Sequence, residues 1–296
     1  MQRQIDRRVV LLGLATLGLV GCAADERPDA VASRLATASP TPTPVPTPIV
    51  APTPTPAPVL IDPGAVAEQF YGATPTAWGT ALPGIAAQLA QQVDASGAPR
   101  AALTFDACGG SGGGGIDHAL IDGLRAAAIP ATLFLNARWI ETHPKFAADL
   151  AADPLFLLAN HGTHHQPLSV KGAAAYGIAG TASVDEAVAE VWGNHVILTE
   201  LVGTPPRYFR AGTAHYDDVA VQIVRALGEI PVGFTINGDG GASYAASTVH
   251  SEIMGLAAGG IVLAHMNQPH SGTAHGALAA AAELRSRGIQ LVHVDA

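Results

Sequence analysis

Short apolar runs recur along residues 99–296, and longer stretches with helical periodicity separate most of them. Seven of these runs have the length and composition of buried strands. They span residues 101–106, 131–135, 155–159, 207–209, 231–236, 261–264 and 289–294. Strands that alternate with helices at this spacing predict an α/β domain with a parallel sheet, either open or closed into a barrel.

The clearest predicted helix covers residues 183–202. Ser183 and Glu186 form a capping box at its start, an apolar stripe runs along it, and a glycine follows its end. His195 lies on that stripe, so we interpret it as a core residue rather than a metal ligand. A further helix is predicted over residues 83–93.

The first 63 residues differ from the rest of the chain. Arginines precede an apolar run over residues 9–20, which has the length of a signal-peptide core and is short for a membrane span. The run ends at Cys22 in the sequence LVGC, which resembles the cleavage box of bacterial lipoproteins; an ordinary signal peptide and a buried helix are the alternatives. We therefore expect a signal peptide at residues 1–21, export to the bacterial cell envelope, and a lipid on Cys22 that anchors the protein to a membrane.

Composition defines the remaining segments and narrows the partners. Residues 22–63 comprise the expected lipidated N-terminus and a linker, in which proline alternates with threonine, valine, alanine and isoleucine over residues 40–58. This composition predicts an extended linker, and a single catalytic domain is expected over residues 64–296. The net charge is −9 and only 13% of residues are charged, so a basic surface for nucleic acid is not expected. Cys22 and Cys108 lie in such different contexts that no disulfide is expected.

Ionisable residues follow five of the predicted strands. In a parallel barrel, strand ends meet on one face, and such folds place their active sites there. The sequence therefore predicts one shared site. Its members are Asp106 after the first strand, His161 and His165 after the third, Arg210 after the fourth, Asp239 after the fifth and His265 after the sixth.

His161 and His165 are four residues apart. This spacing places two imidazoles on one side of a helical turn and suits a divalent metal ion. A metalloprotease is not indicated, because no glutamate follows the first histidine as in the HExxH motif.

These residues resemble the five motifs of polysaccharide deacetylases, carbohydrate esterase family 4. The matching segments, in the family's order, are Thr104-Phe105-Asp106, His161-xxx-His165 before Pro167-Leu168, Phe209-Arg210, Asp239, and Leu263-Ala264-His265. The resemblance covers about residues 99–296. It implies a distorted (β/α)7 TIM-like barrel and the hydrolysis of N-acetyl or O-acetyl groups on a polysaccharide.

The resemblance also implies roles for the site residues. His161 and His165 would hold one divalent metal ion, with zinc expected. Asp106 would be the general base that activates the attacking water, and Arg210 would keep it ionised and oriented. Both roles suit amide hydrolysis, which needs a placed nucleophile.

The leaving group needs a proton, and the resemblance assigns this to His265, the general acid. Asp239 would fix the tautomer of His265 and raise its basicity. Leu263 would line the pocket for the acetyl methyl group, and the backbone N–H near Thr213 would help to hold the oxyanion.

The first motif departs from the family. The family usually has a second aspartate that ligates the metal, and this chain has Ala107 followed by Cys108. In an extended strand, Cys108 faces the same way as Asp106, so it is either a thiolate ligand or a small buried thiol. Arg210 lacks the family's proline-rich turn and no tryptophan accompanies Asp239, which predicts a differently shaped acceptor groove.

The resulting hypothesis is a lipid-anchored, metal-dependent deacetylase of an N-acetylated cell-envelope or extracellular polysaccharide. Two alternatives are a catalytically degenerate, surface-anchored carbohydrate-binding protein and an amidohydrolase of a small non-sugar amide. Glycines at 110, 112 and 115 formally match a dinucleotide fingerprint, but the next strand ends in Asn136 where an acid would be needed. No nucleotide cofactor is therefore expected.

Overall fold

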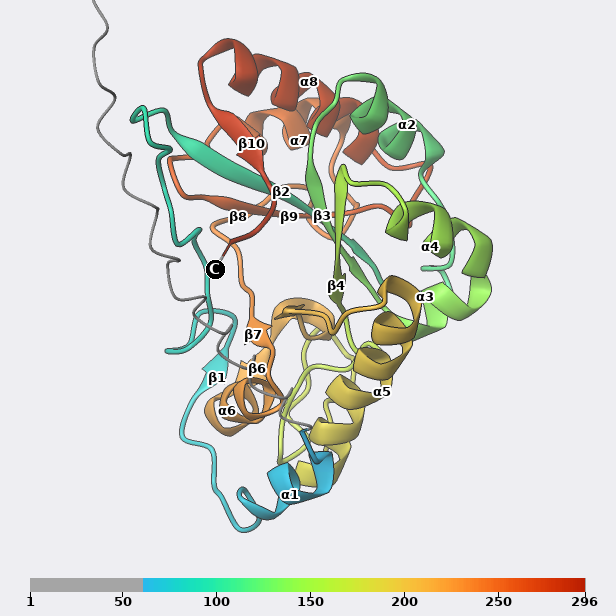
Figure 1. The fold of residues 1–296 in the computed structure, drawn as a ribbon, viewed down its shortest axis with the longest axis vertical. Helices are drawn as coiled ribbons and strands as arrows, with labels where there is room; N and C mark the ends of the chain where they lie inside the picture. The colour runs from blue at the N-terminus through green and yellow to red at the C-terminus, as the bar shows by residue number, and fades with distance from the viewer. Residues whose placement is uncertain (1–60, 296) are drawn as a thin grey trace, which may run out of the picture. The chain divides into compact units, whose positions relative to one another are not determined.

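The computed structural model describes residues 61–295 (Figure 1). The predicted signal peptide, the lipid site at Cys22 and nearly all of the predicted linker lie outside the described residues. Within residues 61–295, no helix combines the length and the apolar character needed to cross a bilayer.

Eight parallel strands form the main sheet, and they fall where the apolar runs predict them. They are β2 (Arg100–Ala107), β3 (Ala131–Leu135), β4 (Phe156–Asn160), β5 (Tyr208–Phe209), β7 (Ile230–Pro231), β8 (Ile236–Asn237), β9 (Ile261–His265) and β10 (Gln290–Val292). A separate antiparallel pair joins β1 (Trp78–Gly79) to β6 (Tyr216–Asp217).

Helices connect the strands and lie on the outside of the curled sheet (Figure 1). They are α1 (Pro63–Glu68), α2 (His118–Ala126), α3 (Ala137–Thr142), α4 (Pro144–Ala151), α5 (Val184–Val202), α6 (Asp218–Ala226), α7 (Ala246–Ile253) and α8 (Thr273–Ser286). One 3-10 turn, η1 (Gly212–Ala214), follows β5. The alternation confirms the predicted distorted α/β barrel.

The order of the sheet brings distant ends of the chain together. It runs β7-β5-β4-β3-β2-β9-β8, and β10 pairs with the start of β2. Asp106 on β2 stands directly opposite His265 on β9, and Asn160 on β4 stands opposite Phe209 on β5. Register alone therefore places the residues that follow these strands on one face.

The predicted strand at 231–236 is two short strands, because the chain changes neighbours within it. The Val232 N–H donates to the carbonyl of Phe209 on the β5 side, whereas the Thr235 N–H donates to Ile261 on the β9 side. The bend between them joins the two ends of the sheet's path, β7 and β8.

The predicted helix over residues 83–93 is wrong. The segment is extended: the Ala86 N–H donates to the Pro231 carbonyl, the Leu89 N–H donates to Gly259, and Leu89 is buried. Pro231 lies on β7 and Gly259 lies in the turn before β9, so pairing along the sheet satisfies the backbone better than a local helix would. Tertiary contacts override helical periodicity here.

The predicted helix after Ser183 is confirmed as α5. The Ser183 hydroxyl accepts a hydrogen bond from the Glu186 N–H at 3.1 Å, and Gly203 ends the helix with a left-handed φ of 81°. His195 is buried as predicted, stacked on Trp192.

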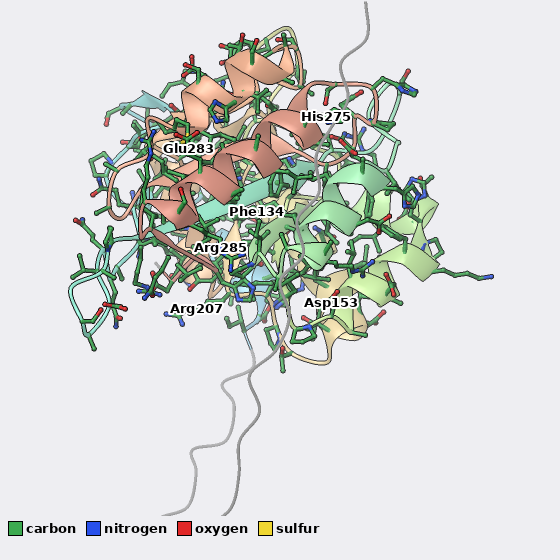
Figure 2. The ribbon with its side chains drawn as sticks, turned by 90° about the horizontal axis from the view of Figure 1, so that it is seen from above. Phe134, Asp153, Arg207, His275, Glu283 and Arg285 are labelled. Atoms are coloured by element: carbon green, nitrogen blue, oxygen red, sulfur yellow. The ribbon has the colours of Figure 1, made fainter. Side chains whose placement is uncertain are left out.

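One apolar cluster fills the inside of the curled sheet. It includes Leu89, Phe134, Tyr208 and Val294, and Phe134 is labelled in Figure 2. The barrel is therefore packed through its interior, and the open face at the strand ends is left for function.

We expect Leu89→Ala to lower the free energy of unfolding by about 2 to 5 kcal/mol, because it leaves a cavity inside the sheet. Val93→Ala, a change in the same segment at a side chain that is 48% exposed, should change it by less than about 0.5 kcal/mol. Urea denaturation of both variants measures the difference. Equal small effects would show that Leu89 does not pack as described.

Candidate active site

A buried ion pair lies at the base of the site. Arg210 donates from Nη1 to Asp106 Oδ1 at 2.7 Å, and both side chains are almost fully buried. Burial by itself would raise the pKa of Asp106, but Arg210, helped by His161 and His265, outweighs it and holds that pKa below its ordinary value. Asp106 is therefore a carboxylate at neutral pH.

His161 lies between this pair and Cys108. Its Nδ1 donates to the backbone carbonyl of Arg210 at 2.8 Å, so its Nε2 is the nitrogen that faces the site. Burial would lower the pKa of His161, but Asp106 and Cys108 raise it above its ordinary value. That Nε2 lies 3.6 Å from Asp106 Oδ2 and 3.8 Å from Cys108 Sγ. This orientation directs Nε2 at the cluster, where it can act as a metal ligand once it has lost its proton.

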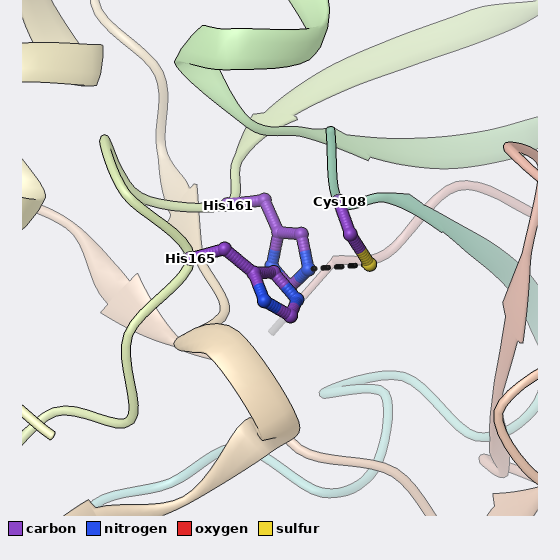
Figure 3. Close-up of side chains that lie close together, drawn as sticks. All are labelled: Cys108, His161 and His165. Carbon is purple, nitrogen blue, oxygen red and sulfur yellow. Dashed lines mark hydrogen bonds between the residues drawn. The ribbon is translucent and has the colours of Figure 1, made fainter. Parts of the chain in front are cut away.

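Cys108, His161 and His165 form a compact cluster of potential metal ligands (Figure 3). Their ligand atoms all lie within 4.8 Å of one another. Burial would raise the pKa of the Cys108 thiol, but hydrogen bonds to His161, His165 and His265 hold it well below its usual range. Cys108 is thus a thiolate at neutral pH in this cluster.

The two histidines do not lie on a helical turn, as their spacing predicts. Residues 161–165 form a loop in which His165 has a left-handed φ of 62°. The buried carboxylate of Glu190 on α5 shapes this loop by accepting from the N–H groups of His164, at 2.8 Å, and Gln166, at 3.0 Å. Glycine is required at 162, where a Cβ would lie only 2.3 Å from Glu190 Oε1.

His265 occupies the opposite side of the site with Asp239. Its Nδ1 lies 2.9 Å from Asp239 Oδ1, and the other carboxylate oxygen accepts from Thr273 Oγ1. Burial would lower the pKa of His265, but Asp239 and Cys108 raise it well above the ordinary value. His265 is therefore an imidazolium at neutral pH.

A pocket of about 470 Å³ opens onto Asp106, His165 and His265. Leu263 on β9 and Thr213 in η1, for which the sequence predicts roles in substrate binding, also line it. Thr213 has a left-handed φ of 64°, and its hydroxyl oxygen is buried without a partner among the described residues. Five of the nine residues singled out from the sequence therefore line this pocket. The other four lie behind them: Arg210 and His161 beside Asp106, Asp239 beside His265, and Cys108 beside His161.

Part of the chain matches a known protein family. Residues 94–230 match the family model described as polysaccharide deacetylase. The chain contains a polysaccharide deacetylase domain. The predicted family is confirmed for this domain. Deacetylases among the similar structures hydrolyse a non-peptide carbon–nitrogen bond. Asp239 and His265 lie beyond the matched residues, and the sheet brings them to the site.

Solved structures share the fold of the deacetylase domain at low identity. One is BA3943, a CE4 family pseudoenzyme from Bacillus anthracis, with 19% identity, a TM-score of 0.55, and coverage of 66% of this chain and 63% of its own. Another is the Bc1960 peptidoglycan N-acetylglucosamine deacetylase, with 18% identity, a TM-score of 0.56, and coverage of 71% and 90%.

A third is an acetyl xylan esterase from Clostridium thermocellum in complex with cobalt, with 19% identity, a TM-score of 0.53, and coverage of 65% and 87%. No curated protein sequence matches the chain. The match to BA3943 spans less than two thirds of that protein's length.

Sequence reasoning missed a buried polar network behind the metal-ligand cluster of the deacetylase domain. Asn160 donates to Glu229 Oε1 at 2.9 Å and accepts from the Gly162 N–H, and His195 Nδ1 lies 2.8 Å from the same Glu229 oxygen. The network fixes the start of the loop that carries His161. Asn160 ends β4 and Glu229 lies between α6 and β7. Neither position belongs to a motif that would mark it in the sequence as a support for the site.

Glu229 should make stability depend on pH. Burial raises its pKa to about 7, although His195 and Asn160 oppose the shift, and its Oε2 is buried without a described partner. Because the folded state holds this proton more tightly than the unfolded state, the stabilisation is complete below the unfolded pKa and is lost as pH rises through about 7.

We therefore expect wild type to lose about 2.5 kcal/mol more unfolding free energy than Glu229→Gln between pH 5 and pH 8. Urea unfolding at both pH values measures this. The surface change Glu252→Gln is the control and should behave as wild type. A parallel pH response in wild type and Glu229→Gln would contradict the assignment.

Proposed function

We propose that this chain is a metal-dependent deacetylase that removes N-acetyl groups, or O-acetyl groups, from a polysaccharide. One observation carries the proposal: a carboxylate with a lowered pKa and a histidine with a raised pKa face the same pocket beside a cluster of metal ligands. Groups whose pKa values are pushed apart in this way serve as the base and the acid of one reaction.

The chemistry of the donor set fits a bound zinc ion. Cys108 supplies a thiolate, and His161 and His165 supply imidazoles, which leaves a fourth position open as in catalytic zinc sites. The hydrogen bond from His161 Nδ1 to a backbone carbonyl is the kind of support that orients a ligating histidine. When bound, the ion would polarise the acetyl carbonyl and make a water molecule more acidic.

Asp106 takes the proton of the attacking water. Arg210 keeps Asp106 ionised and fixes its orientation, because the guanidinium is held on three further sides by Thr104 Oγ1 and the carbonyls of Val232 and Gly233. The Asp106 carboxylate is therefore already oriented before substrate binds, so it does not have to reorient during the reaction.

His265 gives a proton to the departing nitrogen as the carbon–nitrogen bond breaks. Its Nδ1–H donates to Asp239, so the proton that leaves is the one on Nε2. Asp239 is itself fixed by the His265 N–H and the Thr273 hydroxyl, which stops it turning away when the imidazole becomes neutral. In the same pocket, Leu263 would contact the acetyl methyl group and the Thr213 N–H would face the oxyanion.

An N-acetylated polysaccharide of the cell envelope is the proposed substrate. The support is the predicted export signal and the predicted lipid anchor at Cys22, which lies outside the described residues, together with the sugar substrates named for similar structures.

A second candidate is a carbohydrate-binding protein without catalysis. Ala107 stands where the family usually has its second aspartate, and one of the similar structures is a CE4 family pseudoenzyme. The metal content and the activity of the wild-type protein separate the two candidates.

We expect the purified chain to bind about one zinc ion, and His161→Ala to lose both the zinc and acetate release. Cys108→Ser should raise the dissociation constant for zinc by roughly tenfold or more, because it removes a thiolate ligand. Competition with a chelating dye measures both, and His275→Ala, at an exposed histidine on α8 labelled in Figure 2, is the control. Unchanged zinc affinity in Cys108→Ser would show that the Cys108 thiolate is not a zinc ligand.

Asp106→Asn should keep zinc but lower the rate of acetate release from N-acetylated oligosaccharides by roughly 10²- to 10⁴-fold, because the base is lost while the shape is kept. Asp122→Asn on the exposed side of α2 should leave the rate unchanged. A wild-type rate in Asp106→Asn would assign the base to another group.

A further inference from the structure

A second hollow of about 470 Å³ adjoins the catalytic pocket. The two share His165, Ile178, Gly241 and His265, so the neighbouring sugar of a polymer bound in the catalytic pocket has room in the second hollow. The glycine-rich loop after β2 forms one side of the second hollow, and Arg138 at the start of α3 forms another.

The guanidinium of Arg138 forms no ion pair with a described carboxylate, and one of its nitrogens, Nη1, has no hydrogen-bond partner among the described residues. Its Nε donates to Asn136 Oδ1 at 3.2 Å and its Nη2 donates to the Cys108 carbonyl at 3.1 Å. These two bonds hold the guanidinium in place. Among residues 61–295, Nη1 makes no hydrogen bond and no carboxylate pairs with Arg138.

The surroundings make the lack of a counter-charge unusual. The chain has a net charge of −9, yet no described Asp or Glu lines this hollow. Its other polar lining groups are the side chains of Cys108, Ser111, His164, Asn267 and Gln268, together with His165 and His265 of the shared wall. The anionic group in this lining is the Cys108 thiolate, which is hydrogen-bonded to the three site histidines rather than to Arg138. The guanidinium, fixed beside further hydrogen-bond donors, suits an anion supplied from outside the protein.

We infer that Arg138 binds a carboxylate carried by the sugar next to the one that is deacetylated. One guanidinium balances the single charge of a carboxylate, and its free edge can meet both carboxylate oxygens. This inference deepens the proposed function and rests on it for the position of the scissile acetyl group. It makes the enzyme selective for acidic N-acetylated glycans over neutral ones.

The test compares two probes of equal size on the full-length, zinc-loaded protein. One is a tetrasaccharide of N-acetylated sugars in which alternate residues carry a carboxylate on an ether side chain, and the other is its methyl ester. Calorimetry measures binding, and acetate release is followed separately. Wild type should bind the acid roughly ten- to a hundredfold more tightly than the ester.

Arg138→Gln should remove this preference and leave affinity for the ester within about twofold. Arg285→Gln, which removes an equal charge at an exposed site on α8, should keep it (Figure 2). Because Arg138 also contacts the Cys108 carbonyl, zinc content and melting temperature are measured for each variant. If Arg138→Gln loses zinc, Arg138→Lys, which keeps the charge, takes its place and should retain part of the preference.

Equal binding of acid and ester by wild type, or a preference that survives in Arg138→Gln, would overturn the inference while acetate release still supports the proposed function. An Arg138-dependent preference without acetate release from either probe would overturn the deacetylase and leave the acid-binding subsite standing.

Discussion

The buried ion pair between Arg210 and Asp106 is the interaction on which the site depends. Burying a guanidinium is costly unless its donors are satisfied, and here they reach Asp106, Thr104 and two backbone carbonyls, over the face of Phe134 at 4.1 Å. These partners lie on β2, on β3 and in the bend after β7. One side chain therefore ties together strands that are far apart in the chain.

The same pair governs the charges around it. With Asp106 held as a carboxylate, the neighbouring His161 keeps its Nε2 directed at Cys108, while the Arg210 backbone carbonyl fixes the other nitrogen. Removing either partner of a buried pair leaves an uncompensated charge, which typically costs about 3 to 5 kcal/mol. The arrangement of base, thiolate and imidazoles is thus preorganised by the fold.

Support for the site comes from outside the motifs. Glu190 on α5 bonds the backbone on either side of His165, and Asn160 with Glu229 holds the residue after His161. The loop forms no helical hydrogen bonds of its own. The Glu190 carboxylate, and the Asn160 amide held by the Glu229 carboxylate, supply acceptors for its N–H groups instead. The cost of burying these two carboxylates is reflected in their raised pKa values.

The sequence by itself determined the seven apolar runs, the α5 helix and the identity of every residue in the proposed catalytic set. Strand composition, caps and residues at strand ends are local signals, and the parallel fold makes strand ends meet. Only the tertiary structure decided that residues 83–93 are extended, that 231–236 bends into two strands, and that Cys108 lies beside both histidines. Each of these depends on a partner distant in sequence: a neighbouring strand with a free carbonyl, the curvature of the sheet, or the loop held by Glu190. Local periodicity cannot register such partners, because the hydrogen bonds that decide the conformation are made across the fold.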